Sequence, residues 1–320
     1  MNYQEVFQPV FDKLGFELTK TFREGPRFYV VGGEYRREKA TGPERPLARR
    51  AIFKADLEAA AKRLPKARLR LQREAVFLRH AKLRYAPRFY AKGVCEDCFW
   101  ILEEWVPGES QELGESTFLI RDSFFTDQNL RFFLEFLAEL HHLSEKPQPQ
   151  FEKYFSRYTL ADYTYLMRID RDSILGKVLS SKVDVFGKRR HQLFNKNQTM
   201  ITHHEIYGPH IFVNPPSHKA SEGEMNVIDW ENVGWGNLAH DFVEFWIRSF
   251  AHQDFQAELS DRFRASQREK EVFDELFRLE LILQGIGNLN HFKLTEVPEE
   301  REVAEEVSSF LLERIEKAVC

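Results

Sequence analysis

The sequence has little cysteine and no long apolar run, and both shortages limit what the protein can be. Its 320 residues include three cysteines, Cys95, Cys98 and Cys320. So few cysteines do not make the disulfide framework of a small secreted domain, and a reducing, cytoplasmic compartment is expected. Cys95 and Cys98 have the spacing of half a zinc site. No second Cys or His pair at ligand spacing lies near them, so the spacing favours a plain hairpin turn.

The sequence also lacks the marks of a membrane or secreted protein. No apolar run approaches the length of about 18 residues that a membrane span needs, so no membrane partner is expected. The N-terminus has no basic start and carries charges through its middle, unlike a secretion signal. Residues 1–16 instead predict an amphipathic helix. Its apolar face comprises Val6, Phe7, Val10, Phe11 and Leu14.

Charge is unevenly distributed along the chain. The net charge is −4, yet residues 36–92 contain 18 Lys and Arg against five Asp and Glu. A basic surface attracts phosphates, acidic partners or nucleic acid. A solvated helix face explains the same residues without any ligand. Binding of nucleic acid through this stretch is therefore one hypothesis, although an unfavoured one.

Apolar periodicity divides the chain into a strand-rich part and a helical part. Short apolar or alternating segments recur from residue 16 to residue 105, with one long helix expected over 56–82. Helical spacing dominates after a hinge-like Pro-Gly pair at 107–108, with helices expected around 130–140, 239–251, 271–287 and 299–318. We therefore expect an α+β protein with an N-terminal lobe at 1–106 and a helical lobe at 107–320.

The segment 202–214 concentrates polar groups that can do chemistry. It reads THHEIYGPHIFVN, and VIDWE follows at 227–231. Two short apolar strands here each have a polar side chain at one end, His210 before the first and Asp229 after the second. Phosphoryl transfer needs a carboxylate that holds Mg²⁺ and a second group that orients the attacking hydroxyl.

This order of residues resembles the aminoglycoside phosphotransferase and choline kinase-like family, which is related to protein kinases. That family carries H-G-D-x-x-x-x-N, then I-D-W/F-E, then G-x-x-x-x-D. The matching positions here are His203, His204, Glu205, His210, Asp229 and Asp241. The resemblance extends over residues 16–250. It implies a two-lobed protein kinase-like fold with a nucleotide site in the cleft between the lobes.

The resemblance also assigns roles to upstream residues. Lys54, after the apolar strand 51–53, matches the lysine that binds nucleotide phosphates, and Glu74 matches its helix partner. Backbone groups near Glu104 and Val106 match the hinge that holds adenine. The cofactors implied are ATP and Mg²⁺, with Asp229 and His210 as metal ligands. His203 and Asp241 are expected to be structural, Asp241 by accepting hydrogen bonds from loop amides.

Three departures from the family pattern lie within seven residues. Glu205 replaces the catalytic Asp, His210 replaces a metal-binding Asn, and His204 replaces a Gly. Glu reaches one methylene further than Asp, and imidazole suits Zn²⁺ better than Mg²⁺. Three hypotheses therefore remain open. They are an active phosphotransferase with Glu205 as base, a pseudokinase-type nucleotide-binding or scaffolding protein with a protein partner, and another transferase chemistry on the same fold.

The expected substrate is a small molecule with a hydroxyl group. Aromatic and acidic residues in 151–200, together with the helix 239–251, would suit a cationic amino sugar or amino alcohol. The residues of interest are Tyr154, Tyr158, Tyr163, Tyr165 and Asp170. An ordinary aromatic core is the alternative explanation of these residues.

Overall fold

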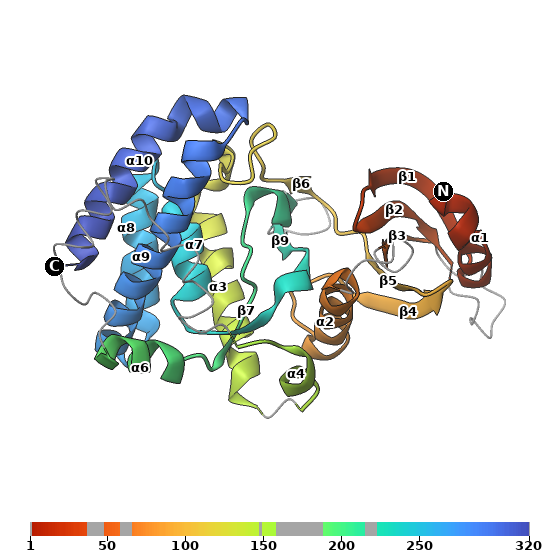
Figure 1. Ribbon diagram of the computed structural model, residues 1–320, viewed down its shortest axis with the longest axis horizontal. Coiled ribbons are helices and arrows are strands. Elements are labelled where there is room, and N and C mark those ends of the chain that lie inside the picture. The colour runs from red at the N-terminus through yellow and green to blue at the C-terminus, as the bar shows by residue number, and fades with distance from the viewer. Residues whose placement is uncertain are drawn as a thin grey trace. The chain divides into compact units, whose positions relative to one another are not determined.

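The computed structural model describes residues 2–36, 48–57, 66–146, 149–157, 188–214 and 223–319. The chain divides into two compact units (Figure 1). The N-terminal unit comprises Met1–Pro107, Pro149–Tyr154 and Ile228–Asn232. The C-terminal unit comprises Gly108–Gln148, Phe155–Val227 and Val233–Cys320. Each unit is described separately below.

The N-terminal unit is built on an antiparallel sheet of order β1-β2-β3-β5-β4. Its strands are β1 (Phe16–Glu24), β2 (Phe28–Tyr35), β3 (Arg49–Asp56), β4 (Phe89–Cys95) and β5 (Cys98–Glu104). The β4–β5 turn consists of Glu96 and Asp97, both with positive φ, and pairs Cys95 with Cys98. The expected hairpin turn at these cysteines is confirmed.

Helices cover both faces of this sheet. Helix α1 (Tyr3–Leu14) buries Phe7 and Phe11 against Phe53 and its neighbours on one face. Helix α2 (Lys66–Ala81) buries Ala67, Leu71 and Ala75 on the other face. Because successive side chains of a strand point to opposite faces, Phe53 faces α1 while Lys54 faces α2. Sheet register thus determines where the Lys54 ammonium lies.

Two short segments from later in the chain complete the N-terminal unit. Helix α4 (Pro149–Tyr154) contributes Phe151, whose ring stacks near that of Phe77 at 6.2 Å between centroids. A 3₁₀ turn (Trp230–Asn232) contributes the buried Trp230, whose ring stacks on Phe77 at 4.1 Å. This stacking against α2 fixes the position of Asp229, the residue just before the turn.

The C-terminal unit is mainly helical. It contains α3 (Asp127–His142), α6 (Lys188–Lys196), α7 (His240–Arg248), α8 (Gln253–Ser266), α9 (Lys270–Leu294) and α10 (Pro298–Val319). Helix α10 runs beside α9, as the blue ribbons of Figure 1 show. All nine residues of α7 are buried, so α7 is the central helix of this unit. None of the described helices is long and apolar enough to cross a membrane.

Short strands accompany these helices. One sheet has the order β6 (Glu109–Ser110), β8 (Ile211–Asn214) and β9 (Glu224–Val227), and β7 (Met200–Thr202) pairs with β10 (Gly234–Gly236). The predicted strand hairpin around residues 211–228 is confirmed. The β7–β10 pair and the separate helix α8 were not predicted.

The α+β layout with a strand-rich first part and helical second part is confirmed. The structure adds two details to this layout. Strand β2 continues to Tyr35, and residues 37–47 lie outside the described residues. The helix expected over 56–82 is described only from Lys66 to Ala81, and 58–65 lie outside the described residues.

Candidate functional site

A buried lysine in the N-terminal unit is surrounded by carboxylates. Lys54 Nζ lies 2.7 Å from Glu74 Oε1, 3.0 Å from Glu103 Oε1 and 3.7 Å from Asp229 Oδ1. The side chains of Glu74 and Glu103 are almost fully buried, whereas that of Asp229 is 33% exposed. Three predicted site residues, Lys54, Glu74 and Asp229, therefore lie together.

Electrostatics keep Lys54 charged. Burial alone would lower its pKa, but the nearby Glu103, Glu74 and Asp229 carboxylates raise it well above the usual value. Burial raises the pKa of Glu74 well above its usual range, and Glu103 and Asp229 raise it further against the opposing effect of Lys54. One ammonium thus faces three carboxyl groups, and the cluster has an excess of negative charge at any pH where all three are ionised. A cation would be attracted to this cluster.

Two buried carboxylate oxygens of this cluster also favour a bound cation. Glu74 Oε2 and Glu103 Oε2 are buried and have no hydrogen-bond partner among the described residues. Glu74 Oε1, the oxygen that faces Lys54 Nζ, also accepts a hydrogen bond from the Trp230 N–H at 3.2 Å, which ties α2 to the segment that carries Asp229. Asp229 itself has φ 65°, a left-handed conformation that is uncommon outside glycine. Oxygen donors of this kind fit a hard divalent cation such as Mg²⁺.

Sequence reasoning missed Glu103. This residue is paired in register with Ile52, two positions before Lys54 on the same face of the sheet. A diagonal neighbour on an adjacent strand is within reach of a long side chain such as lysine. Residues 99–102 are a continuous apolar run with no alternation, so the role of Glu103 depends on the β3–β5 register, which the sequence alone does not supply.

The predicted hinge lies at the end of β5, and its two residues, Glu104 and Val106, differ in the hydrogen bonding of their backbone groups. The Glu104 N–H already donates to Arg88 O at 2.8 Å. In the described residues, by contrast, no hydrogen bond reaches the backbone of the buried Val106. Val106 is therefore the predicted hinge residue whose backbone groups form no hydrogen bond with the described residues. Its neighbour Trp105 lies over Gly32, where an added Cβ would meet the indole at 2.4 Å.

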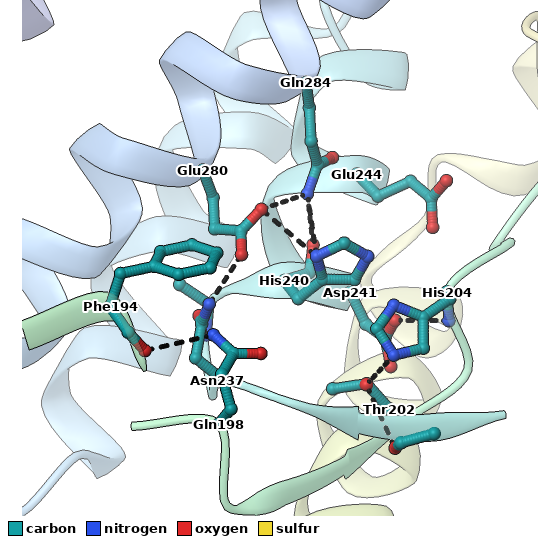
Figure 2. A network of polar contacts seen from close by, with 12 residues as sticks. Phe194, Gln198, Thr202, His204, Asn237, His240, Asp241, Glu244, Glu280 and Gln284 are labelled. Carbon is teal, nitrogen blue, oxygen red and sulfur yellow. Dashed lines mark hydrogen bonds and ion pairs between the residues drawn. The ribbon is translucent and has the colours of Figure 1, made fainter. Parts of the chain in front are cut away.

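The segment 203–210 in the C-terminal unit is held by α7 (Figure 2). Asp241 Oδ2 accepts from the His203 N–H at 2.7 Å, and Asp241 Oδ1 accepts from the His204 N–H at 3.0 Å. Glu244 Oε2, one turn along, accepts from the Ile206 N–H at 2.9 Å. The structural role predicted for Asp241 is confirmed by these bonds, because a loop between strands has few other acceptors for its buried amides.

The backbone conformation of His204 explains why the family pattern has a glycine at this position. Its φ is 70°, in the left-handed region, so the backbone expected of glycine is kept although the residue has changed. The Thr202 hydroxyl donates to Gly234 O at 3.3 Å, so His204 Nε2 must be the donor in its 2.6 Å contact with Thr202 Oγ1. That bond helps to hold a side chain at this strained position.

Glu205 and His210 lie close together within the C-terminal unit. His210 Nδ1 is 2.7 Å from the Glu205 carbonyl oxygen. A carbonyl cannot donate, so Nδ1 carries the proton and Nε2 carries the lone pair, which is the tautomer of a metal-ligating imidazole. The ring of His210 stacks on Tyr207 at 5.3 Å. The second predicted pair of site residues is therefore placed by backbone contacts and ring packing.

An ion pair buried beneath this loop stabilises α7. His240 Nδ1 lies 3.1 Å from Glu280 Oε2 on α9, and Asn237 and Gln284 also bond this carboxylate (Figure 2). Burial lowers the pKa of His240, but the charge and hydrogen bond of Glu280 raise it to about 9. Burial raises the pKa of Asp241 to about 6, against the effect of His240. His240 is thus a cation at neutral pH and compensates the carboxylates around it.

Comparison with protein families identifies the chain. The model of the phosphotransferase enzyme family APH matches residues 37–277, about three quarters of the sequence. The chain belongs to this family. The matched range includes Lys54, the loop 203–210 and Asp229, so the family resemblance of the sequence is confirmed. A comparison with curated proteins found no significant match.

Solved structures show the fold. The GDP and kanamycin complex of APH(2")-IIia matches with a TM-score of 0.62 at 13% identity, covering 99% of this chain and 97% of that one. The GDP complex of wild-type aminoglycoside 2'-phosphotransferase-IIIa matches with a TM-score of 0.60 at 14% identity, with the same coverage. The two-lobed, protein kinase-like fold of this phosphotransferase family is therefore confirmed.

The predicted substrate region is largely outside the described residues. Tyr158, Tyr163, Tyr165 and Asp170 all fall within 158–187, which the structure does not describe. Tyr154 is described, at the end of α4 in the N-terminal unit, where its carbonyl accepts from Arg73 at 3.4 Å. The other part of the predicted substrate region, residues 239–251, includes α7. The aromatic side chains of α7 are buried, which agrees with the alternative explanation that they belong to the core.

Proposed function

We propose that the protein is an ATP-dependent phosphotransferase that phosphorylates a hydroxyl group of a small molecule. The observation that carries the proposal is the cluster of Lys54, Glu74 and Asp229, with Glu103 as a fourth member. A charged lysine fixed by one glutamate and facing a partly exposed aspartate is the arrangement that nucleotide phosphates and their metal require. Membership of the phosphotransferase family supports the same reaction class.

Each residue has a role in the proposed reaction. Lys54 contacts the nucleotide phosphates, and Glu74 holds its ammonium in place. The Val106 backbone, which has no partner in the described residues, holds the base. Asp229 is the metal ligand of the N-terminal unit, and His210 is the further ligand assigned from the sequence. Mg²⁺, when bound, supplies positive charge that offsets the charge of the transferring phosphoryl group.

Glu205 is the proposed base. It orients the substrate hydroxyl and accepts its proton as the oxygen attacks the γ-phosphorus and the bond to the leaving nucleoside diphosphate breaks. The short segment around Glu205 is fixed by Asp241 and Glu244, so its carboxylate starts from a defined backbone position. A fixed backbone at Glu205 limits how far its carboxylate is displaced by the methylene that Glu has in addition to Asp.

A cationic amino sugar or amino alcohol remains the proposed substrate. A similar solved structure is a complex with kanamycin, which supports an aminoglycoside-like ligand as the first compound to try. The cytoplasmic location and the lobe boundary at 106–107 likewise remain proposals.

A pseudokinase is the second candidate function. Glu205, His210 and His204 all differ from the family pattern, and His210 offers nitrogen where Mg²⁺ prefers oxygen. This candidate keeps nucleotide binding through Lys54 and Asp229, but it transfers phosphate slowly or not at all. A protein partner would then be the expected target.

One experiment separates these functions. Melting temperature is measured with ATP or GTP, each with Mg²⁺ or Mn²⁺, and nucleoside diphosphate release is then followed with a panel of hydroxyl-bearing amines. Stabilisation with turnover supports the phosphotransferase, and stabilisation without turnover supports the pseudokinase. Asp229→Asn should abolish metal-dependent turnover, and Glu316→Gln on the exposed face of α10 is the matched control. No stabilisation by any nucleotide contradicts both.

A further inference from the structure

A cavity in the C-terminal unit lies on the far side of α7 from the loop 203–210. Asp241, Glu244 and Arg248 of α7 face that loop, since Asp241 and Glu244 bond its amides and Arg248 lies over the Tyr207 ring at 4.4 Å. Phe242 and Trp246 project from the opposite side of the helix and line a cavity of about 370 Å³. This cavity is therefore separate from the predicted catalytic residues.

The base of the cavity is aromatic. Besides Phe242 and Trp246, it is lined by Phe273 and Phe277 of α9. These rings contact one another edge to face, with 5.5 Å between the centroids of Phe242 and Phe273 and 5.2 Å between those of Trp246 and Phe277. Its volume is in the range of small-molecule sites. An aromatic ring system of one or two rings is the apolar group that suits such walls.

The rim of the cavity has four cations and two carboxylates, Asp261 and Asp274, and one of the cations forms no ion pair with the described residues. Arg264 is paired with Asp274 by two 2.7 Å bonds, and Arg278 and Lys317 have glutamate neighbours. Arg314 differs: its Nε is buried without a hydrogen-bond partner, and no carboxylate of the described residues lies within ion-pair distance. The Arg314 guanidinium lies over the rings of Trp246 and Phe310, at 5.9 and 5.4 Å.

We propose that this cavity binds a small aromatic carboxylate, with its ring against Trp246, Phe273 and Phe277 and its carboxylate on Arg314. A guanidinium that forms no ion pair among the described residues is suited to a carboxylate, which its terminal N–H groups bind in a planar, charge-assisted contact. A neutral aromatic compound would offer no negative charge to the Arg314 guanidinium. Recognition therefore depends on both the ring and the negative charge.

Two probes of similar size test the proposal. Binding of 2-naphthoate and of 2-naphthalenemethanol to the full-length protein is measured by titration calorimetry. The carboxylate should bind about tenfold more tightly than the alcohol, the effect of one charge-assisted contact at a partly exposed site. Arg314→Gln should remove this preference, and Arg314→Lys should restore part of it. Arg301→Gln, an exposed position on the same helix, should change neither affinity.

The location of binding is tested independently. The Trp246 indole N–H donates to Ser260 Oγ at 2.9 Å, so its amide-type NMR signal reports on the cavity wall. Addition of 2-naphthoate should shift this signal, assigned with Trp246→Phe, and leave those of the other four tryptophans in place. The proposal is overturned if neither probe binds at millimolar concentration, if both bind equally, or if signals other than that of Trp246 move.

Discussion

Asp241 Oδ1 accepts a hydrogen bond at 3.0 Å from the backbone N–H of His204, the loop residue with a left-handed backbone. The other oxygen of the same carboxylate accepts from the His203 N–H. A single side chain of α7 therefore satisfies two consecutive buried amides and fixes the loop that carries Glu205.

Replacing Asp241 by Ala should destabilise the protein by about 2–4 kcal/mol. The variant leaves two buried N–H groups without an acceptor, and each unsatisfied group costs roughly 1–3 kcal/mol. Denaturant unfolding of both proteins measures the difference. Glu316→Ala, an exposed change on α10, is the control and should stay within about 0.5 kcal/mol of the original. A loss below about 1 kcal/mol for Asp241→Ala would show that water replaces the carboxylate.

Two substitutions of His204 separate backbone strain from side-chain bonding. Both His204→Gly and His204→Ala remove the hydrogen bond to Thr202. Only glycine adopts φ 70° without strain, which costs about 1–2 kcal/mol for other residues. We therefore expect His204→Gly to be more stable than His204→Ala by about 1 kcal/mol in denaturant unfolding. Equal stabilities would mean that the loop changes its backbone conformation when the imidazole is lost.

The sequence predicted the site best where a short motif fixes the chemistry. Lys54, Glu74 and Asp229 were assigned because short segments around them resemble the family pattern, and Lys54 Nζ lies 2.7 Å from Glu74 and 3.7 Å from Asp229. Glu103 was missed because its role depends on register between two strands rather than on neighbours in the sequence.

The same limit applies in the helical part of the chain. The pairing of β7 with β10 joins residues more than 30 positions apart through strands of only three residues, too short to show a period. Helix α8 was missed for a related reason, since its few apolar positions make only a weak helical pattern. Contacts that are distant in sequence are therefore what the sequence alone did not predict.

The buried pair of His240 and Glu280 should make stability depend on alkaline pH. The pKa of His240 is raised to about 9 in the folded protein, above the usual value of 6.5. A raised pKa means that the folded state binds the proton more tightly, so this contribution is fully present below about pH 6.5 and is lost as pH rises through about 9. The whole shift corresponds to about 3 kcal/mol.

Denaturant unfolding between pH 6.5 and 9.5 tests this dependence. The free energy of unfolding should fall across the range for the original protein, and His240→Gln should be less stable at pH 6.5 but show a flatter profile. His252→Gln, a partly exposed histidine at the start of α8, is the matched control and should keep the original slope. An unchanged slope in His240→Gln would assign the titration to another group.

Removing the charge of Lys54 should destabilise the protein much more than removing the charge of Glu103. Lys54→Met leaves Glu74 and Glu103 buried without a cation, which costs about 3–5 kcal/mol when both are ionised. Because burial already raises the pKa of both glutamates, they take up protons as pH falls, so the loss should be larger at pH 8 than at pH 5.

Glu103→Gln instead removes one of three negative charges and leaves Lys54 with Glu74 and Asp229. Its stability at pH 8 should stay within about 1 kcal/mol of the original. Denaturant unfolding at the two pH values measures both, with the exposed Lys92→Met as control. If Glu103→Gln costs as much as Lys54→Met, then Glu103 holds the lysine and Glu74 does not, and the partner assigned from the sequence is wrong.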